Sequence, residues 1–376
     1  MTSTSPISLA SIVSQSAEER KPNEPVFIKN GRRKLCFGRC PSIRMVDQKY
    51  LLERAENSAT GKNEAFGQSF TIIAIPDTVP PVALRRGIDP NSVEVRIEQK
   101  RDIQHYQNIS HKNIAPLLCV ISSDKLGLLE VFPLYDSDLF DYMLLNSYRS
   151  VDIRNWMRQV SEALEYLHEK RIVHSDVKIE NILIRSENDE KKVALTDFGW
   201  AGEVGTFLIS ATSYCAPEIS SFWWRGDTCY LQQVTDTELR KRYERAVEND
   251  IWSLGFAIRK LIDYFHPDEE SIAVRNFLNG QEHGSQAEIN KLVNDLVART
   301  GKDLAVSKEK RDVAYCQVAD TEEARTEIRD LLLLAQNMMA ADPAKRPDNA
   351  VIKRMPGARP DMPEAMLQSS DTISAC

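Results

Sequence analysis

The sequence predicts an α+β protein with two lobes, a smaller strand-rich lobe followed by a larger and mainly helical lobe. The chain has 376 residues, of which 42% are hydrophobic, and this exceeds the usual size of a single hydrophobic core. Strand-like segments gather between residues 50 and 85, whereas apolar residues at helical spacing dominate after residue 150. This order of segments favours one lobe of each kind.

The small lobe is predicted from three strand-like segments within residues 50–85, namely YLLER, SFTIIAI and PPVALR. Polar segments that contain Gly and Pro separate them, as is typical of loops between strands. Residues 91–109 follow, and the spacing of Val95, Ile103 and Tyr106 fits a helix. We therefore expect a small sheet with one helix beside it.

Three helices are predicted for the large lobe. The apolar residues between Ile153 and Leu167 share one helical face, which predicts a helix with one buried side. Residues 250–262 are apolar on nearly every side, as expected of a central buried helix. Residues 327–339 form a third periodic segment, which ends before Pro343.

The most informative stretch is IVHSDVKIENIL, which covers residues 172–183. It places Asp176, Lys178 and Asn181 at the spacing of a loop that activates a hydroxyl and holds a magnesium ion for phosphoryl transfer. Four further motifs follow in order: TDFGW with Asp197, Phe198 and Gly199, CAPE with Ala216, Pro217 and Glu218, NDIWSLGF with Asp250 and Trp252, and DPAKRP with Arg346. One octapeptide could occur by chance, whereas this ordered set is specific.

Through these motifs the chain resembles the eukaryotic-type protein kinases from about residue 46 to about residue 355. The resemblance implies a bilobal kinase-like fold, with a small antiparallel β-rich N-lobe that carries the αC helix and a larger, mainly helical C-lobe. The N-lobe is expected at about residues 46–131 and the C-lobe at about residues 135–355. Residues 1–45, which include a basic patch, and residues 356–376 are expected to be flexible tails.

The same resemblance implies a non-specific serine/threonine protein kinase that transfers the γ-phosphate of ATP to hydroxyls of protein substrates. Asp176 would orient the acceptor hydroxyl and take its proton. Asp197 and Asn181 would hold Mg²⁺, and Lys178 would contact the γ-phosphate. Lys178 is typical of the serine/threonine kinases, and Glu180 matches a position that favours basic residues near the acceptor.

A nucleotide site is also implied by the resemblance. Its expected members are Gly61 and Gly67 in a glycine-rich loop, Ala83 and Arg85 on a nearby strand, Phe132 and Leu134 in the hinge, and Asp138 at the ribose. Val131 falls at the gatekeeper position. Because Pro133 lacks an N–H, the adenine is expected to use the carbonyl of Phe132 and the amide of Leu134. The hinge string FPLYDSDLFDYM is also similar to the hinges of herpesviral serine/threonine kinases.

The sequence departs from the family pattern in the small lobe. Arg85 replaces the usual strand lysine, and a planar guanidinium does not reproduce the point charge of an ammonium at a phosphate site. Glu64 stands at the second glycine of the loop and would repel a phosphate, although Lys62 in the same loop could supply a replacement ammonium. The acid of the αC helix is Asp102 by residue count or Glu98 by side-chain reach, and we favour Glu98.

These departures leave two other functions open. One is a pseudokinase, which would act as a scaffold or allosteric partner with weakened ATP binding. The other is a small-molecule kinase of the aminoglycoside type, which shares the H-x-D loop but lacks the later motifs. Ser175 also replaces an arginine that pairs with a phosphorylated activation segment in many relatives, and this argues against such a switch.

Composition and insertions restrict the partners and the location. The net charge of −7 with mixed signs argues against a nucleic-acid partner, and the seven scattered cysteines are typical of reduced intracellular thiols. No secretory signal or membrane-spanning stretch is found, so we expect an intracellular protein, cytoplasmic or nuclear, with no membrane partner. Residues 222–246 are expected to be an insertion that packs on the large lobe or docks a partner, with packing favoured. The oligomeric state is left open.

Overall fold

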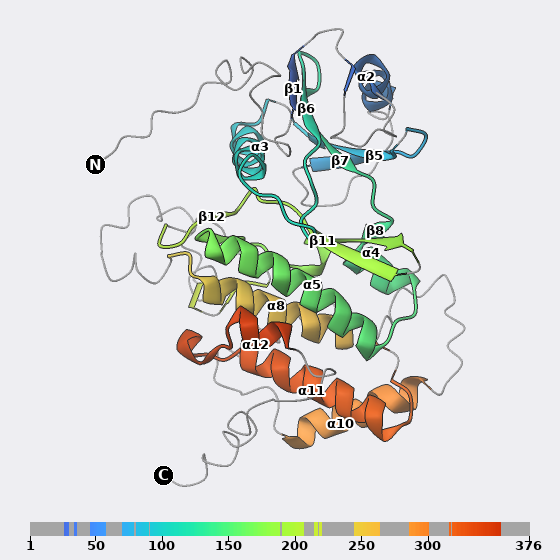
Figure 1. Ribbon diagram of the computed structural model, residues 1–376, viewed down its shortest axis with the longest axis vertical. Coiled ribbons are helices and arrows are strands. Elements are labelled where there is room, and N and C mark those ends of the chain that lie inside the picture. Colours follow the sequence, from blue (N-terminus) through green and yellow to red (C-terminus); the bar gives the residue numbers. More distant parts are fainter. Residues whose placement is uncertain are drawn as a thin grey trace.

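A computed structural model describes residues 26–29, 34–35, 46–57 and 70–354 of the chain, the last range with gaps at 79, 90, 189, 207–213, 217, 220–243, 264–285, 301–315 and 317. A small strand-rich lobe lies at the top of the view in Figure 1, and a larger helical lobe lies below it. The predicted bilobal α+β fold is confirmed by this arrangement.

Five strands form the sheet of the small lobe, in the order β1-β6-β7-β5-β4. Their bounds are β1 (Val26–Lys29), β4 (Phe70–Ile75), β5 (Val82–Gly87), β6 (Cys119–Ser123) and β7 (Gly127–Pro133). Strands β4 to β7 pair antiparallel, and β1 pairs parallel with β6. Helix α3 (Val93–Tyr106) follows β5 and is the predicted αC helix. It begins after Ser92, whose hydroxyl accepts the N–H of Val95 and caps the helix.

The segment predicted as an N-terminal tail contributes short strands. Strand β1 extends the sheet at one edge, and β2 (Lys34–Leu35) pairs with β3 (Val46–Asp47) in a separate ribbon. These pairings differ from the flexible tail expected for residues 1–45. The other residues of that segment, and residues 356–376, lie outside the described residues.

The segment YLLER is a helix, so its assignment to a strand is wrong. Helix α2 covers Gln48–Asn57. Leu51 and Ala55 are one helical turn apart and both are fully buried against the sheet, in a cluster with Leu84 and Val131. The i, i+4 contact therefore decides the conformation, and a short apolar run alone does not distinguish helix from strand.

Helices dominate the large lobe. They are α4 (Leu139–Leu145), α5 (Ser150–Glu169), α8 (Val247–Ile262), α10 (Gln286–Thr300), α11 (Glu322–Met338) and α12 (Asn349–Lys353). The predicted helices correspond to α5, α8 and α11, and α5 packs against α8, α11 and α12. Short elements carry the loops between them: β8 (Ser137–Asp138), β9 (Ile172–Val173), β10 (Ile182–Glu187), β11 (Glu190–Leu195), β12 (Gly202–Glu203) and the 3-10 turns at Ile179–Asn181 and Pro343–Lys345.

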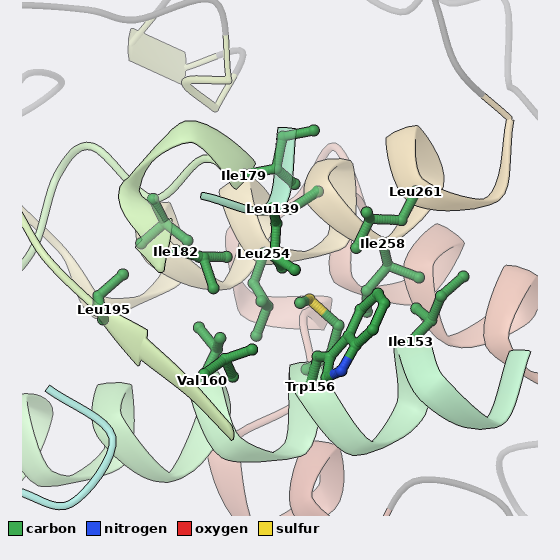
Figure 2. Packing of buried hydrophobic residues seen from close by; sticks show 14 of the residues in the cluster. Leu139, Ile153, Trp156, Val160, Ile179, Ile182, Leu195, Leu254, Ile258 and Leu261 are labelled. Carbon is green, nitrogen blue, oxygen red and sulfur yellow. The ribbon is translucent and has the colours of Figure 1, made fainter. Parts of the chain in front are cut away.

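The core of the large lobe lies between α5 and α8. Figure 2 shows Trp156 and Val160 of α5 facing Leu254 and Ile258 of α8, and all four side chains are buried. Ile179 and Ile182 flank the catalytic loop and enter the same cluster. The loop is therefore anchored at its C-terminal side by apolar contacts with two buried helices. Within the part of the chain that the structure describes, no helix combines the length and the apolar character needed to cross a bilayer.

Substitution of Leu254 by Ala tests this core. The side chain is fully buried on α8, so its truncation is expected to lower the free energy of unfolding by about 2–5 kcal/mol. The matched control is Leu145→Ala at the end of α4, where the leucine is 81% exposed and the loss should be below about 0.5 kcal/mol. Urea denaturation measures both, and equal losses would contradict the packing described.

Candidate active site

The residues of the predicted catalytic loop converge on the carboxylate of Asp176. The ammonium Nζ of Lys178 donates to Oδ2 of Asp176 at 2.7 Å, and Nδ2 of Asn181 donates to the same oxygen at 2.9 Å. The other oxygen, Oδ1, is buried and has no hydrogen-bond partner among the described residues. A buried acceptor without a partner is uncommon in a folded protein. Asp176 Oδ1 is therefore an acceptor held ready for a group from outside the chain.

Burial and charge act in opposite directions on the Asp176 and Lys178 pair. Burial raises the pKa of Asp176 above its usual range, in spite of the neighbouring ammonium. Burial would lower the pKa of Lys178, but the carboxylate of Asp176 outweighs it and the pKa is raised. The two groups therefore form an ion pair with one free carboxylate oxygen.

The carboxylate of Asp250 on α8 binds the backbone of the catalytic loop. It accepts the backbone N–H of His174 at 2.8 Å and of Ser175 at 2.9 Å, and it contacts Nε2 of His168 at 2.9 Å. Ser175 has a φ of 67°, in the left-handed region that is costly for most residues other than glycine. The buried carboxylate stabilises this turn and thus orients Asp176, the next residue.

Arg85 lies at the centre of the other half of the site. Its Nη1 donates to Asp102 at 2.8 Å and to Glu130 at 2.9 Å, and its Nη2 donates to Oδ1 of Asp197 at 2.9 Å. The guanidinium also stacks on Phe70, with Cζ 3.7 Å from the ring centroid. Arg85 therefore connects β5, α3, β7 and the segment that begins at Asp197.

Asp102, and not Glu98, is the acid of α3 that pairs with Arg85, so the preference for Glu98 is wrong. Asp102 also accepts the backbone N–H of Phe198. Glu98 lies one turn earlier and packs on Gly199, where an added Cβ would approach Cγ of Glu98 to 2.6 Å. Reach was the wrong criterion, because the bulkier guanidinium of Arg85 extends to the shorter acid.

Four aromatic rings connect the two lobes beside this network. The ring centroids of His174 and Phe198 are 4.9 Å apart, those of Phe198 and Tyr106 are 5.0 Å apart, and those of Tyr106 and Phe132 are 5.4 Å apart. Each pair is tilted or edge-on, which is the favoured geometry for aromatic rings. The row runs from the catalytic loop through α3 to β7. It therefore fixes Phe198, the neighbour of Asp197, between the lobes.

The strand register favours Phe132 over Val131 for the gatekeeper position. In the pairing of β5 with β7, Ala83 is opposite Phe132, and Leu84 is opposite Val131. Side chains alternate between the faces of a sheet, so Phe132 shares a face with Ala83 and Arg85. Val131 points to the opposite face and packs in the core of the small lobe. The predicted hinge was therefore misplaced by one residue.

Two predicted nucleotide contacts are already used within the protein. The backbone N–H of Leu134 donates to the carbonyl of Pro81 at 3.0 Å, so the prediction that it binds adenine is wrong. Asp138 is the N-cap of α4, and its Oδ1 accepts the N–H of Asp141 at 2.8 Å. Burial raises the pKa of Asp138 to about 6. The backbone of Phe140 also hydrogen-bonds this carboxylate, so its first role in the structure is to cap α4.

Further motif residues form the support of the site. Glu218 and Arg346 form a two-pronged ion pair, with contacts of 2.7 Å and 2.8 Å. Arg245 precedes α8 and was not predicted to contribute. Its guanidinium donates to Oγ of Ser175 at 3.3 Å and to Oγ1 of Thr206 at 2.9 Å. A cation therefore lies beside Ser175, at the place where the sequence lacks one.

Several predicted features lie outside the described residues. They are Gly61, Lys62, Glu64 and Gly67 of the glycine-rich loop, Pro217, and nearly all of the 222–246 insertion. Among the described residues, helix α2 is the element before this segment and strand β4 is the element after it.

The oxygen atoms of the site suit a hard divalent cation. Asn181 uses its amide nitrogen on Asp176, so its carbonyl oxygen is the atom left for a ligand, and Asp197 offers a carboxylate nearby in the same site. Mg²⁺ prefers oxygen donors and is commonly held by one or two carboxylates together with phosphates and water. The described residues contain no cluster of three or more His, Cys, Asp or Glu that could hold a metal alone. A site completed by phosphate oxygens fits this donor set.

The protein kinase domain family matches residues 88–356, which is well over half of the chain. The chain belongs to the protein kinase family. Among curated kinases, it is 30% identical over 177 residues to the probable serine/threonine-protein kinase pXi of Dictyostelium discoideum, covering 46% of this chain and 23% of the relative. It is 31% identical over 174 residues to myosin light chain kinase A of the same organism, covering 45% of this chain and 52% of the relative.

A third similar kinase is the calcium/calmodulin-dependent protein kinase type 1 of Caenorhabditis briggsae, 28% identical over 174 residues, which are 45% of this chain and 43% of the relative. The matched segment thus spans about half or less of each of these relatives. The eukaryotic-type resemblance drawn from the motifs is confirmed at the level of the family.

Three members of the kinase site were not predicted from the sequence: Phe70, Glu130 and Arg245. Glu130 carried a signal, because it is an acid within the apolar run GLLEVF of a strand. Such an acid indicates a buried charge with a partner. Phe70 and Arg245 lie in ordinary surroundings in the sequence and become recognisable only through the fold.

Glu98 provides a pH-dependent test of the site. Burial, followed by the charge of Asp197, raises its pKa from 4.5 to about 7. The folded state therefore loses stability as the pH rises from 4.5 to 7, because the buried carboxyl must ionise. Glu98→Gln should stabilise the kinase at about pH 8 by on the order of 1 kcal/mol, with little gain at about pH 5. Urea denaturation at both pH values measures this difference.

The control for that experiment is Glu169→Gln, at the exposed end of α5. It should change stability equally at both pH values. A gain from Glu98→Gln that is independent of pH would contradict the buried, ionisable role of Glu98.

Proposed function

We propose that the chain is a serine/threonine protein kinase that transfers the γ-phosphate of ATP to hydroxyls of protein substrates. The observation that carries this proposal is the arrangement around Asp176, where Lys178 and Asn181 bind one carboxylate oxygen and leave the other without a partner. The names of similar kinases, among them a probable serine/threonine-protein kinase, support the same acceptor class. Lys178 supports it as well, through the resemblance described above.

In this proposal Asp176 acts as the base. Its Oδ1 accepts a hydrogen bond from the acceptor hydroxyl and takes the proton as the bond to phosphorus forms. Lys178 and Asn181 fix the orientation of the carboxylate through Oδ2. Lys178 lies close enough to Asp176 to place its positive charge beside the transferred phosphoryl group. Asp250 keeps the loop in position by holding two backbone N–H groups.

Asp197 and Asn181 are the residues that would hold Mg²⁺ in the kinase. When bound, this ion neutralises charge on the phosphates of ATP. Arg85 already pairs with Asp197 and would contribute a guanidinium to the phosphates from the small lobe. The intact contact between Arg85 and Asp102 keeps α3 close to Asp197, as the transfer requires.

The hinge atoms proposed for adenine are the carbonyl of Pro133 and the N–H of Tyr135. Backbone groups of successive residues point to opposite edges of a strand, and Leu134 donates toward β5. The backbone groups of Pro133 and Tyr135 therefore face the edge of β7 that pairs with β6. The pairing with β6 ends at Val131, opposite Cys119, so it does not reach Pro133 or Tyr135. Ala83 and Phe132 would contact the base from the same face of the sheet.

The substrate is proposed to be a protein with basic residues near the acceptor. Glu180, which supports this preference, is 36% exposed in its side chain and lies 3.7 Å from Lys260. Its Oε1 faces Lys260, and its Oε2 is buried without a hydrogen-bond partner among the described residues, so an acceptor remains for a basic side chain of a substrate. An intracellular location, cytoplasmic or nuclear, remains part of the proposal.

A pseudokinase is the second candidate. It is favoured by the ion pair between Arg85 and Asp197, since this guanidinium occupies an oxygen proposed for the metal ion. Such a protein would act through its surface as a scaffold or allosteric partner.

Phosphate transfer by the purified protein distinguishes the two candidates. With Mg-ATP and a basic protein substrate, Asp176→Asn should lower kcat by about 10²–10⁴-fold, because the base is lost while the shape is kept. Glu187→Gln, on an exposed strand end, is the control and should retain the wild-type rate. Absence of transfer by the wild-type protein, in the presence of normal folding, would favour the pseudokinase.

A further inference from the structure

Glu130 is a buried acid that the proposed reaction does not use. It lies on β7 directly opposite Arg85 of β5, and its side chain is fully buried. Its Oε2 accepts from Nη1 of Arg85 at 2.9 Å. Its Oε1 is buried and has no hydrogen-bond partner in the described part of the chain. Arg85 is thus the contact that makes this acid tolerable in the core.

The neighbours of Glu130 on the strand are apolar, which makes its identity informative. Leu129 and Val131 are both fully buried in the core of the small lobe, and Glu130, on the opposite face of β7, is equally buried. A buried acid destabilises a protein unless a charged or hydrogen-bonding partner compensates for its desolvation. We therefore relate the presence of Glu130 at this position to its contact with the guanidinium of Arg85.

The shape of the guanidinium explains why Arg85 is bound by two acids on one nitrogen. Asp102 and Glu130 both accept from Nη1, which leaves Nη2 for Asp197 and for a phosphate. Phe70 covers the flat face of the same group. These contacts fix the plane of the Arg85 guanidinium, whose Nη1 and Nη2 form the two arms of a fork. The compact ammonium of a lysine has no second arm, so a lysine that pairs with the two buried acids would leave Asp197 and a phosphate without the donor that Nη2 supplies.

We propose that Glu130 is a positioning residue of the nucleotide site, which holds the Arg85 fork in place and adapts this site to arginine. The inference rests on the proposed binding of ATP but not on turnover. It reverses the expectation from the resemblance, because arginine becomes the residue that the surroundings require. Position 130 and position 85 then form a coupled pair, and each is functional only with the matching partner.

A double-mutant cycle tests the pair, with Kd for Mg-ATP measured by titration and KM and kcat measured where transfer occurs. Glu130→Leu and Arg85→Lys should each raise Kd at least about tenfold, as expected for the loss of a charge-assisted hydrogen bond. The double variant should recover to within about threefold of the wild type, because lysine then meets Asp102 alone. The effect should fall on KM more than on kcat.

Glu130→Gln separates positioning from folding. Glutamine keeps the shape and one oxygen acceptor, so Kd should stay much closer to the wild type than with Glu130→Leu. Unfolding without nucleotide identifies variants that fail to fold, and Glu187→Gln is the exposed control. Additive effects of the two single substitutions, or an unchanged Kd for Glu130→Leu, would overturn the inference. A wild-type protein that binds Mg-ATP without transfer would overturn only the proposed kinase activity, whereas one that binds no Mg-ATP would overturn both.

Discussion

The buried guanidinium of Arg85 is the interaction on which the arrangement of the site depends. It makes charged contacts with Asp102 of α3, Glu130 of β7 and Asp197 of the large lobe. One cation among three carboxylates leaves an excess of negative charge in a region of low dielectric. Burial raises the pKa of Asp102 to about 6 and raises that of Glu130 well above its usual range, whereas the charge of Arg85 lowers the pKa of Asp197 despite its burial. Among the three acids around Arg85, only the metal-binding candidate Asp197 has a pKa below its usual range.

The two halves of the site differ in how they are held. The half around Asp176 rests on α5 and α8, whose apolar side chains form the continuous core shown in Figure 2. The half around Arg85 depends on charged contacts between separate elements and on the row of rings from His174 to Phe132. Apolar packing is little affected by salt or pH, whereas a charged network responds to both.

Patterns of residues along the chain predicted the parts of the protein with the strongest periodicity or the most specific spacing. Helices α5, α8 and α11 followed from apolar faces, and the group at Asp176, Lys178 and Asn181 followed from the motif. Helix α2 was missed because a five-residue apolar segment fits both periods. The choice of Asp102 over Glu98, and the shift of the gatekeeper to Phe132, depend on strand register and on the reach of one arginine. The residue count did favour Asp102, but strand register and the reach of a side chain cannot be read from local sequence.

Asp250 has a consequence for how the protein responds to ligands. Its carboxylate ties the catalytic turn to a helix whose residues are buried on nearly every side. Movement of this turn would require the largest helical core to shift, and close-packed cores resist such shifts. Adjustment to a nucleotide should therefore be confined to the small lobe and α3, while the floor beneath the acceptor stays still. The residues of the small lobe can thus shift around a bound nucleotide while the orientation of Asp176 is kept.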